Sequence, residues 1–237
     1  MKNNHVVNTT SLQTKPPLPT PHSPLPIKIK ICGLFREQDI DYVNEARPDY
    51  AGFVFAESKR QVSHAFAAHL RLLLSGEIIP VGVFANAPIA DIASLYNENV
   101  ISIAQLHGGE EGDYIRRLKK ASAAGGKRPI EVIKSVKSAE LEKNAPPAKG
   151  ADYYLIDSGA GSGKAFDWEL LNLPGVEAVK AKPWFLAGGI GLGNIKRAMY
   201  FNPYALDVSS GAETGGIKDR AKIVQLTAIV RKGKGNE

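Results

Sequence analysis

The 237 residues suit one α/β barrel or two smaller domains, and a 43% hydrophobic, 23% charged composition is typical of a globular protein. No run approaches the ~18 unbroken apolar residues that a membrane helix needs. The single cysteine excludes an internal disulfide, and with it a secreted scaffold built on disulfides.

The net charge of +6 raises the question of a nucleic-acid partner, so its location matters. Residues 1–30 hold four lysines and no acid, and residues 231–237 hold three bases and one acid. The chain between them has as many acids as bases. A neutral body with basic ends lacks the continuous basic face of a nucleic-acid reader, so we expect neither a nucleic acid nor a membrane as partner.

Residues 1–26 are predicted to be a separate, flexible, proline-rich tail. Six prolines between Pro16 and Pro26 favour an extended polyproline conformation over a packed element. The segment lacks the apolar stretch of a secretory signal, while a transit peptide stays open because acidic residues are absent. A docking peptide is the alternative to a solvated tail.

Eight short apolar or β-branched runs follow, with starts 21 to 31 residues apart: 27–32, 51–55, 79–84, 101–107, 130–134, 153–157, 184–188 and 205–210. Stretches between them space apolar residues at helical intervals, most clearly at 36–46, 63–74, 88–99 and 218–230. Alternating strands and helices imply parallel strands joined by crossovers. Eight units predict a (β/α)₈ barrel over residues 27–231, followed by a basic C-terminal end at 232–237. An open doubly wound sheet is the rival, and the number of strands disfavours it.

In such a barrel the active site lies at the C-terminal ends of the strands. Glycine-rich loops follow the seventh and eighth predicted strands, where this fold often binds phosphate through backbone N–H groups and a helix N-terminus. One precedes a helix expected near Asn194, and the other precedes the final helix. Tight turns are the alternative explanation. The expected phosphate-binding residues are Gly188, Gly189, Ser210 and Gly211.

Two nucleotide motifs are excluded. The stretch 158–165 has Ser158 where a P-loop needs its first glycine, and Ala165 follows Lys164 where the motif needs Ser or Thr. The stretch 189–194 has Asn194 in place of the third glycine of a dinucleotide fingerprint.

Two predicted strand ends carry groups suited to proton transfer. Asp157 closes the sixth strand, where partial burial favours the protonated form of a general acid; ordering the following glycine loop is the alternative. Cys32 closes the first strand. It is either a small buried hydrophobe or, as a thiolate, a reactive group that could pair with His107.

Other strand ends carry groups suited to binding. Arg60 has the fork of donors that clamps a carboxylate, although a solvated loop charge is the default. Asp207 lies within the eighth strand, where it either contacts substrate hydroxyls or forms a salt bridge to Lys28 or Lys30. No spacing of His, Cys, Asp and Glu indicates a metal site, and we expect none.

Seven stretches, taken together and in order, resemble phosphoribosylanthranilate isomerase, the (β/α)₈ enzyme family of tryptophan biosynthesis. They are "KICGL" (30–34), "GFVFAESKRQV" (52–62), "VGVFAN" (81–86), "QLHGGE" (105–110), "IDSGAGSGKAFDW" (156–168), "LAGGIGLGNI" (186–195) and "DVSSGAETGGIKD" (207–219).

The resemblance implies an Amadori rearrangement of N-(5-phosphoribosyl)anthranilate to 1-(2-carboxyphenylamino)-1-deoxyribulose 5-phosphate, without a cofactor. It implies that Asp157 is the general acid and Cys32 the general base. Arg60 would hold the anthranilate carboxylate, with His107 and Asp207 as further substrate-binding residues and the two glycine loops on the phosphate. It also implies a cytoplasmic enzyme, either monomer or homodimer, whose partner is a phosphosugar substrate.

The sequence departs from the family at Lys59, where Ser-Pro-Arg is usual. A related histidine-pathway isomerase is the nearest alternative, but it uses aspartates at the ends of strands one and five, where this chain has Cys32 and Lys134. A non-catalytic phosphosugar-binding barrel is the alternative from another class, and the presence of both Cys32 and Asp157 disfavours it.

Removal of residues 1–26 is expected to leave both isomerase activity and melting temperature nearly unchanged, because their composition gives them little apolar surface to bury. Activity assays and thermal melts of the truncated and full-length chains test this. A large loss of either property would mean that the tail packs on the barrel.

Overall fold

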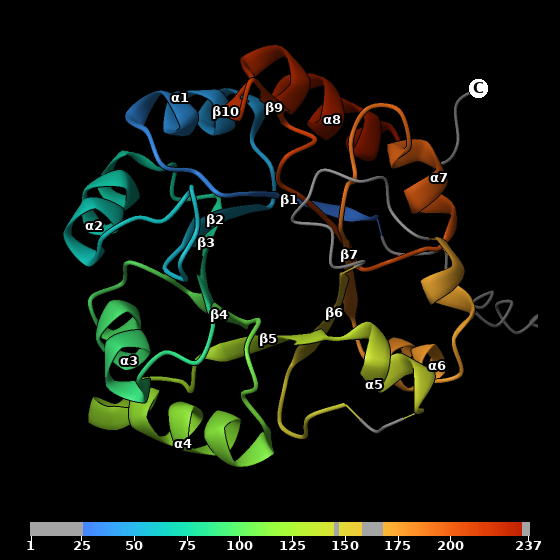
Figure 1. The fold of residues 1–237 in the computed structure, drawn as a ribbon. Coiled ribbons are helices and arrows are strands. Elements are labelled where there is room, and N and C mark those ends of the chain that lie inside the picture. The colour runs from blue at the N-terminus through green and yellow to red at the C-terminus, as the bar shows by residue number, and fades with distance from the viewer. Residues whose placement is uncertain (1–25, 145–146, 158–167, 234–237) are drawn as a thin grey trace, which may run out of the picture.

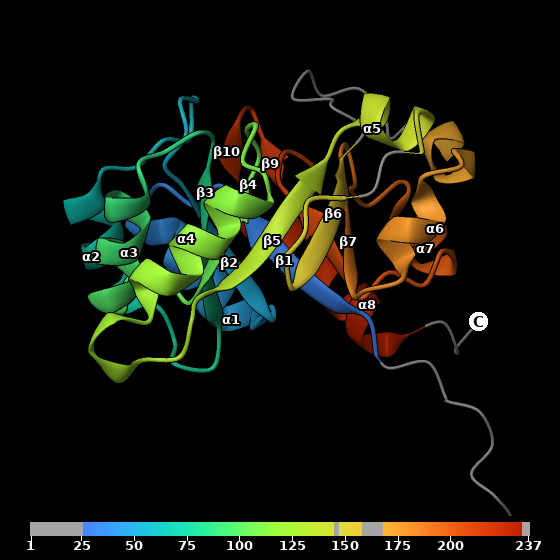
Figure 2. The same cartoon turned by 90° about the horizontal axis from the view of Figure 1, so that it is seen from below.

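The structure, a computed structural model, describes residues 26–144, 147–157 and 168–233. Within these ranges eight parallel strands close into a barrel in sequence order, with helices around the outside (Figures 1 and 2). The predicted (β/α)₈ fold is confirmed. Apart from Pro26, the predicted tail lies outside the described residues, as do 234–237 of the basic end.

Each barrel strand coincides with a predicted run to within a few residues. The strands are β1 Lys28–Cys32, β2 Tyr50–Val54, β3 Ile79–Phe84, β4 Ile103–Leu106, β5 Glu131–Val136, β6 Tyr153–Asp157, β7 Trp184–Ala187 and β8 Ala205–Val208. The helices are α1 Glu37–Ala46, α2 His64–Leu73, α3 Ile89–Asn97, α4 Gly112–Ser122, α5 Ser138–Glu142, α6 Val176–Lys180, α7 Ile195–Tyr200 and α8 Arg220–Lys232. Short 3₁₀ turns occupy Ala124–Gly126 and Trp168–Asn172, and a hairpin of β9 (Glu213–Thr214) and β10 (Ile217–Lys218) precedes α8.

Side chains at the helix starts satisfy backbone N–H groups that have no partner within the helix. Ser63 Oγ accepts from the Phe66 N–H ahead of α2 at 3.1 Å, and Asp219 Oδ1 accepts from the Lys222 N–H at the start of α8, also at 3.1 Å. Pro88 occupies the N-cap position just before α3. No helix in the described ranges is long and apolar enough to cross a bilayer.

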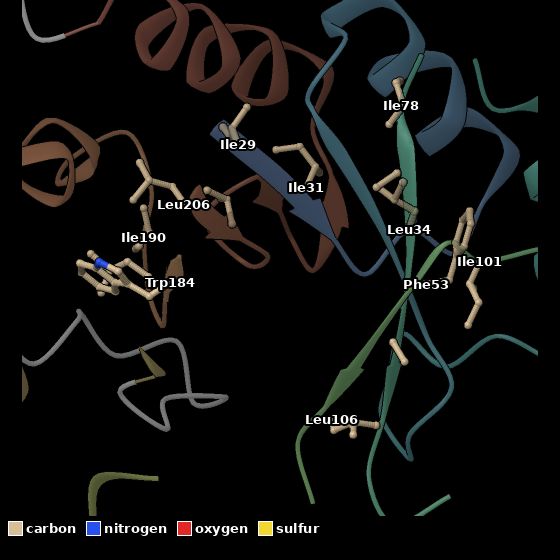
Figure 3. Close-up of a cluster of buried hydrophobic side chains, with 14 of the residues drawn as sticks. Ile29, Ile31, Leu34, Phe53, Ile78, Ile101, Leu106, Trp184, Ile190 and Leu206 are labelled. Carbon is tan, nitrogen blue, oxygen red and sulfur yellow. The ribbon is translucent and has the colours of Figure 1, made fainter. Parts of the chain in front are cut away.

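The strands bury residues on both faces, because side chains alternate between the barrel interior and the surrounding helices. The outward layer includes Ile29, Ile31, Phe53 and Leu206 and forms the main core with the helices (Figure 3). An inner cluster fills the barrel with Tyr50, Val81, Ile103, Ile133, Leu155, Phe185, Ala187 and Ala205. On β1 the inward positions are Lys28, Lys30 and Cys32, so this strand brings polar groups to the barrel axis.

Strand register fixes the neighbours of those polar groups. Lys30 on β1 is directly beside Asp207 on β8, and Cys32 is directly beside Gly52 on β2. Neighbouring residues in register share a face of the sheet. Lys30 and Asp207 therefore both face the interior, and Gly52 leaves space there for the Cys32 thiol.

Candidate active site

A cavity of about 290 Å³ opens at the C-terminal ends of the strands. Its lining includes all five side chains predicted to act on substrate, together with three of the four predicted phosphate residues: Cys32, Arg60, His107, Asp157, Asp207, Gly188, Gly189 and Ser210. Gly211 is outside the lining. A larger hollow of about 740 Å³ lies around the N-terminal ends of the strands and contains none of the predicted site residues.

A buried ion pair forms the floor of the cavity. Lys30 is fully buried and its Nζ donates to Asp207 Oδ2 at 2.9 Å. Of the two lysines considered as partners for Asp207, Lys30 is the one that pairs; Lys28 Nζ instead donates to the Tyr204 hydroxyl at 2.9 Å. Asp207 Oδ1 is buried without a hydrogen-bond partner among the described residues. The carboxylate therefore keeps an oxygen available for a substrate hydroxyl, so both roles considered from the sequence are compatible.

The Cys32 thiol lies above this pair and is itself buried. Burial raises the pKa of Cys32; Lys30 opposes that shift, Asp207 adds to it, and the pKa stays above its ordinary value. A β-carbon at Gly52 would come within 2.8 Å of Cys32 Sγ and 3.2 Å of Lys30 Cε. The thiol and the lysine stem thus pack over the same glycine, and the thiol position is fixed by both.

Gln105 on β4 is a site residue that the sequence analysis missed. Its Nε2 lies 2.5 Å from His107 Nε2 and 3.5 Å from Asp207 Oδ2. The Asp207 carboxylate can only accept, which assigns the Gln105 nitrogen to this side and leaves Gln105 Oε1 buried and without a partner in the described structure. The sequence held a signal for Gln105. It is two residues before His107 in the same extended segment, and residues two apart in such a segment share a face.

His107 is expected to be neutral. Burial lowers its pKa, and the nearby Asp157 charge only partly offsets this effect. The contact with Gln105 requires His107 Nε2 to be an acceptor, which agrees with an uncharged ring. His107 therefore offers the cavity a neutral imidazole rather than a cation.

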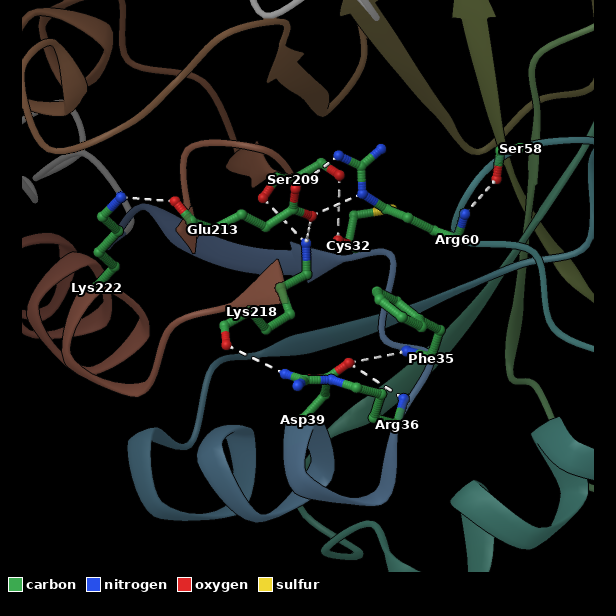
Figure 4. A network of polar contacts seen from close by, with 10 residues as sticks. All are labelled: Cys32, Phe35, Arg36, Asp39, Ser58, Arg60, Ser209, Glu213, Lys218 and Lys222. Atoms are coloured by element: carbon green, nitrogen blue, oxygen red, sulfur yellow. Dashed lines mark hydrogen bonds and ion pairs between the residues drawn. The ribbon is translucent and has the colours of Figure 1, made fainter. Parts of the chain in front are cut away.

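Arg60 reaches the cavity rim from the loop after β2, and a carboxylate of the protein holds it there (Figure 4). Its Nε and Nη2 donate to the two oxygens of Glu213 at 2.6 and 2.7 Å. Lys218 Nζ also donates to Glu213, at 2.5 Å. Burial would raise the pKa of Glu213, but the hydrogen bonds from Arg60 and Lys218 lower it below its ordinary value. Two of the three guanidinium nitrogens of Arg60, which was expected to bind a substrate carboxylate, are thus already bound to Glu213. The third, Nη1, does not take part in this ion pair.

The two predicted phosphate loops pack directly against each other. Gly188 and Gly189 have φ of +98° and +62°, a region that favours glycine. A β-carbon at Gly211 would lie 1.9 Å from the Ile190 carbonyl oxygen, so only glycine permits this approach. Asn194 accepts from the Gly191 N–H at 2.9 Å and donates to the Gly189 carbonyl at 3.0 Å. This bridge within the loop accounts for asparagine where the dinucleotide fingerprint has glycine.

The first of these loops is followed by the expected helix. It is α7, which begins directly after Asn194 and has only six residues, so its dipole is weaker than that of a longer helix. The second loop does not lead directly into the final helix, because the β9–β10 hairpin lies between them. That hairpin contains Glu213 and Lys218. Because Glu213 binds Arg60, the segment after β8 also positions this arginine.

Lys134 was expected at the end of the fifth strand, but it lies two residues before the end of β5 and is held by a backbone carbonyl and a carboxylate. Its Nζ donates to the Gly108 carbonyl at 2.8 Å and lies 3.6 Å from Glu110 Oε2. The glycine loop after Asp157, residues 158–167 with Lys164, is outside the described residues. Within the described ranges, no group of three or more His, Cys, Asp or Glu side chains is placed to hold a metal ion.

Known proteins are similar to this chain both in amino-acid sequence and in the arrangement of strands. Residues 29–228 match the family model for N-(5'-phosphoribosyl)anthranilate (PRA) isomerase. The chain belongs to this family. An N-(5'-phosphoribosyl)anthranilate isomerase of Endomicrobium trichonymphae is 45% identical over 210 residues, which cover 86% of this chain and 98% of the relative.

Solved structures of the family have the same fold. The phosphoribosyl anthranilate isomerase of Thermotoga maritima superposes with a TM-score of 0.71 at 30% identity, covering 87% of this chain and 98% of that one. A second isomerase structure, in complex with reduced 1-(o-carboxyphenylamino)-1-deoxyribulose 5-phosphate, gives a TM-score of 0.69 at 27% identity, covering 87% and 99% of the two chains.

The Arg60–Glu213 pair generates a test of carboxylate binding. Arg60→Ala is expected to raise the KM for substrate at least about tenfold with a smaller change in kcat, because it removes ground-state binding of the carboxylate. Glu213→Gln keeps the arginine but weakens its anchor, so it is expected to raise KM by a smaller factor. Steady-state kinetics of both variants measure these effects. An unchanged KM in Arg60→Ala would contradict the carboxylate-binding role.

Gly211→Ala tests the packing of the two loops. The added methyl group overlaps the Ile190 carbonyl, so the loops must separate, and we expect a loss of about 1–3 kcal/mol in the free energy of unfolding. Phosphate-bearing ligands should also bind more weakly. Denaturant unfolding and a binding titration with inorganic phosphate measure both, and Gly193→Ala is the control because no atom lies near its β-carbon position. Equal stability of the two variants would contradict the packing argument.

Proposed function

We propose that this cavity carries the Amadori rearrangement of the family, with Asp157 as general acid and Cys32 as general base. The chain is an enzyme of tryptophan biosynthesis that isomerises N-(5'-phosphoribosyl)anthranilate. The observation that carries the assignment of roles is that Cys32 and Asp157, from the ends of β1 and β6, line one cavity together with the expected substrate-binding groups.

In the first step, Asp157 donates its proton to the ribose ring oxygen. The bond between that oxygen and C1 breaks, and the nitrogen lone pair forms the C=N⁺ bond of an open-chain iminium. His107 is close enough to Asp157 for the two side chains to interact electrostatically. The leaving oxygen becomes the C4 hydroxyl.

In the second step, the Cys32 thiolate removes the proton from C2. The iminium is the electron sink: the C–H electrons form the C1–C2 double bond while the C=N⁺ pair returns to nitrogen. The resulting enolamine takes a proton at C1 and loses the C2 hydroxyl proton, which gives the aminoketose. No cofactor is required for this sequence.

The remaining groups suit the parts of the substrate that do not react. Arg60 Nη1 is available for the anthranilate carboxylate, while Glu213 fixes the other edge of the guanidinium. Asp207 Oδ1 and Gln105 Oε1 are buried acceptors suited to the sugar hydroxyls. Gly188, Gly189 and Ser210 border the cavity where the phosphate would bind, and Gly211 holds their loop against its neighbour.

The reading as a histidine-pathway isomerase has less support. That reaction needs a second carboxylate near the end of strand five, whereas β5 has Lys134 two residues before its end, and this side chain donates to the Gly108 carbonyl. A cytoplasmic location is also part of our proposal and rests on the biosynthetic role. Whether the enzyme is a monomer or a homodimer stays a prediction.

Replacement of either proposed proton-transfer group tests the mechanism. Cys32→Ala and Asp157→Asn are each expected to lower kcat by about 10²–10⁴-fold, because each removes one proton-transfer step. The loss of substrate fluorescence as the anthranilate adduct is consumed provides the assay, and circular dichroism checks the fold. Near-normal turnover in either variant would refute that residue's role.

A further inference from the structure

Lys30 is a buried cation that the mechanism above does not use. It is fully enclosed by the barrel, and Cys32 is two residues further along the same strand, so both side chains point to the barrel axis. The stems of both pack over Gly52, whose missing side chain gives them room. The lysine is therefore next to the proposed base, below it in the barrel.

The Lys30 ammonium group is close to two groups that can carry negative charge, the Asp207 carboxylate and the Cys32 thiol. Lys30 Nζ is 2.9 Å from Asp207 Oδ2, and the Cys32 sulfur, which packs over the same glycine, is close enough to influence the ammonium electrostatically. Burial lowers the pKa of Lys30, but Asp207 and Cys32 together raise it above its ordinary value. Lys30 is thus charged throughout the working pH range. With Asp207 ionised and the thiol neutral the pair is balanced, and ionisation of Cys32 adds a second negative charge to the same ammonium.

We propose that Lys30 is a positioning residue that shares its ammonium between Asp207 and the Cys32 sulfur, and so makes ionisation of the buried base less unfavourable and holds it beneath the substrate. This inference rests on the proposed role of Cys32 as base. It gives Asp207 two tasks, because its carboxylate binds the substrate and also draws Lys30 away from the thiolate. Binding of a hydroxyl group to Asp207 Oδ1 would then weaken that competition.

Other charged groups near Cys32 are less well placed for this task. Lys218, on β10, also favours the thiolate, but it is bound to Glu213 and contributes less than Lys30 does. Arg60 is held by the same carboxylate. His107 is neutral, and Asp157 has the wrong sign to stabilise a thiolate. Lys30 is therefore the main cationic support of the base.

The test is a pH titration of the Cys32 thiol in substrate-free protein. The chain has one cysteine, so the ultraviolet absorbance of the thiolate reports on Cys32 alone once the Cys32→Ala titration is subtracted. Lys30→Met is expected to raise the thiol pKa by about one unit or more, which is roughly tenfold less thiolate at a given pH below the pKa. Asp207→Asn is expected to lower it, because Lys30 then serves the thiolate alone.

Two further variants keep the test decisive. Lys28→Met removes the neighbouring inward lysine of β1, which contacts Tyr204 rather than Cys32, and should leave the thiol pKa unchanged. If Lys30→Met fails to fold, Lys30→Met/Asp207→Asn removes the pair without leaving a buried charge. Its thiol pKa should still exceed that of the wild type, since the Lys30 contribution is larger than that of Asp207.

Activity gives a second readout that a purely structural role would not produce. The kcat of Lys30→Met should be reduced at neutral pH and recover as the pH is raised, with KM much less affected. A thiol pKa equal to that of the wild type in both Lys30 variants would overturn the inference while leaving the isomerase assignment intact. Full activity of Cys32→Ala would instead overturn the proposed base, whatever the titration shows.

Discussion

The buried pair of Lys30 and Asp207 determines how the open end of this barrel is organised. An ammonium group inside an apolar barrel is tolerated only with a partner, and breaking such a pair typically costs about 3–5 kcal/mol. Strand register places the two residues side by side on β1 and β8, where the barrel closes. The same contact orders the side chains on either side of it, with an inner apolar cluster toward one end and the cavity toward the other.

Above this pair, each functional group has a second contact that fixes it. Cys32 has Lys30 and the space over Gly52, Arg60 has Glu213, and Gln105 bridges to His107. Two of the buried acceptors left without a hydrogen-bond partner in the described structure, Asp207 Oδ1 and Gln105 Oε1, belong to residues that line the cavity. A sugar with several hydroxyl groups matches that arrangement, because each hydroxyl can donate to a buried acceptor that otherwise stays unsatisfied.

Much of this could be predicted from the sequence because local patterns determine it. The spacing of apolar runs identified the barrel, and the rule that active sites occupy strand ends selected Cys32, Asp157 and the glycine loops. Gln105 could also have been predicted, because it is two residues from His107 and alternate residues of a strand share a face. Glu213 was not, because its contact with Arg60 depends on a short hairpin 153 residues away in sequence. The choice of Lys30 over Lys28 as the partner of Asp207 likewise depended on strand register, which the sequence pattern does not define.

The length of the helix beside the expected phosphate loop could not be predicted for a related reason. A glycine run followed by a helical pattern does not reveal how long the helix will be, and α7 has six residues. The close approach of the two loops at Gly211 also follows from the closure of β7 against β8 rather than from either loop alone. Tertiary contacts therefore decide the details of the proposed binding site, while the proposed catalytic positions follow from the strands.

The most direct test of the account is a crystal structure of this enzyme with a reduced analogue of the aminoketose product. If Cys32 is the base, its Sγ is expected to be the protein atom nearest to the sugar C2, at roughly 3–4 Å, with the Asp157 carboxyl group at the C4 hydroxyl. The phosphate is also expected to lie against Gly189 and Ser210. A ligand bound with C2 facing His107 and away from the thiol would contradict the assignment of Cys32 as the base.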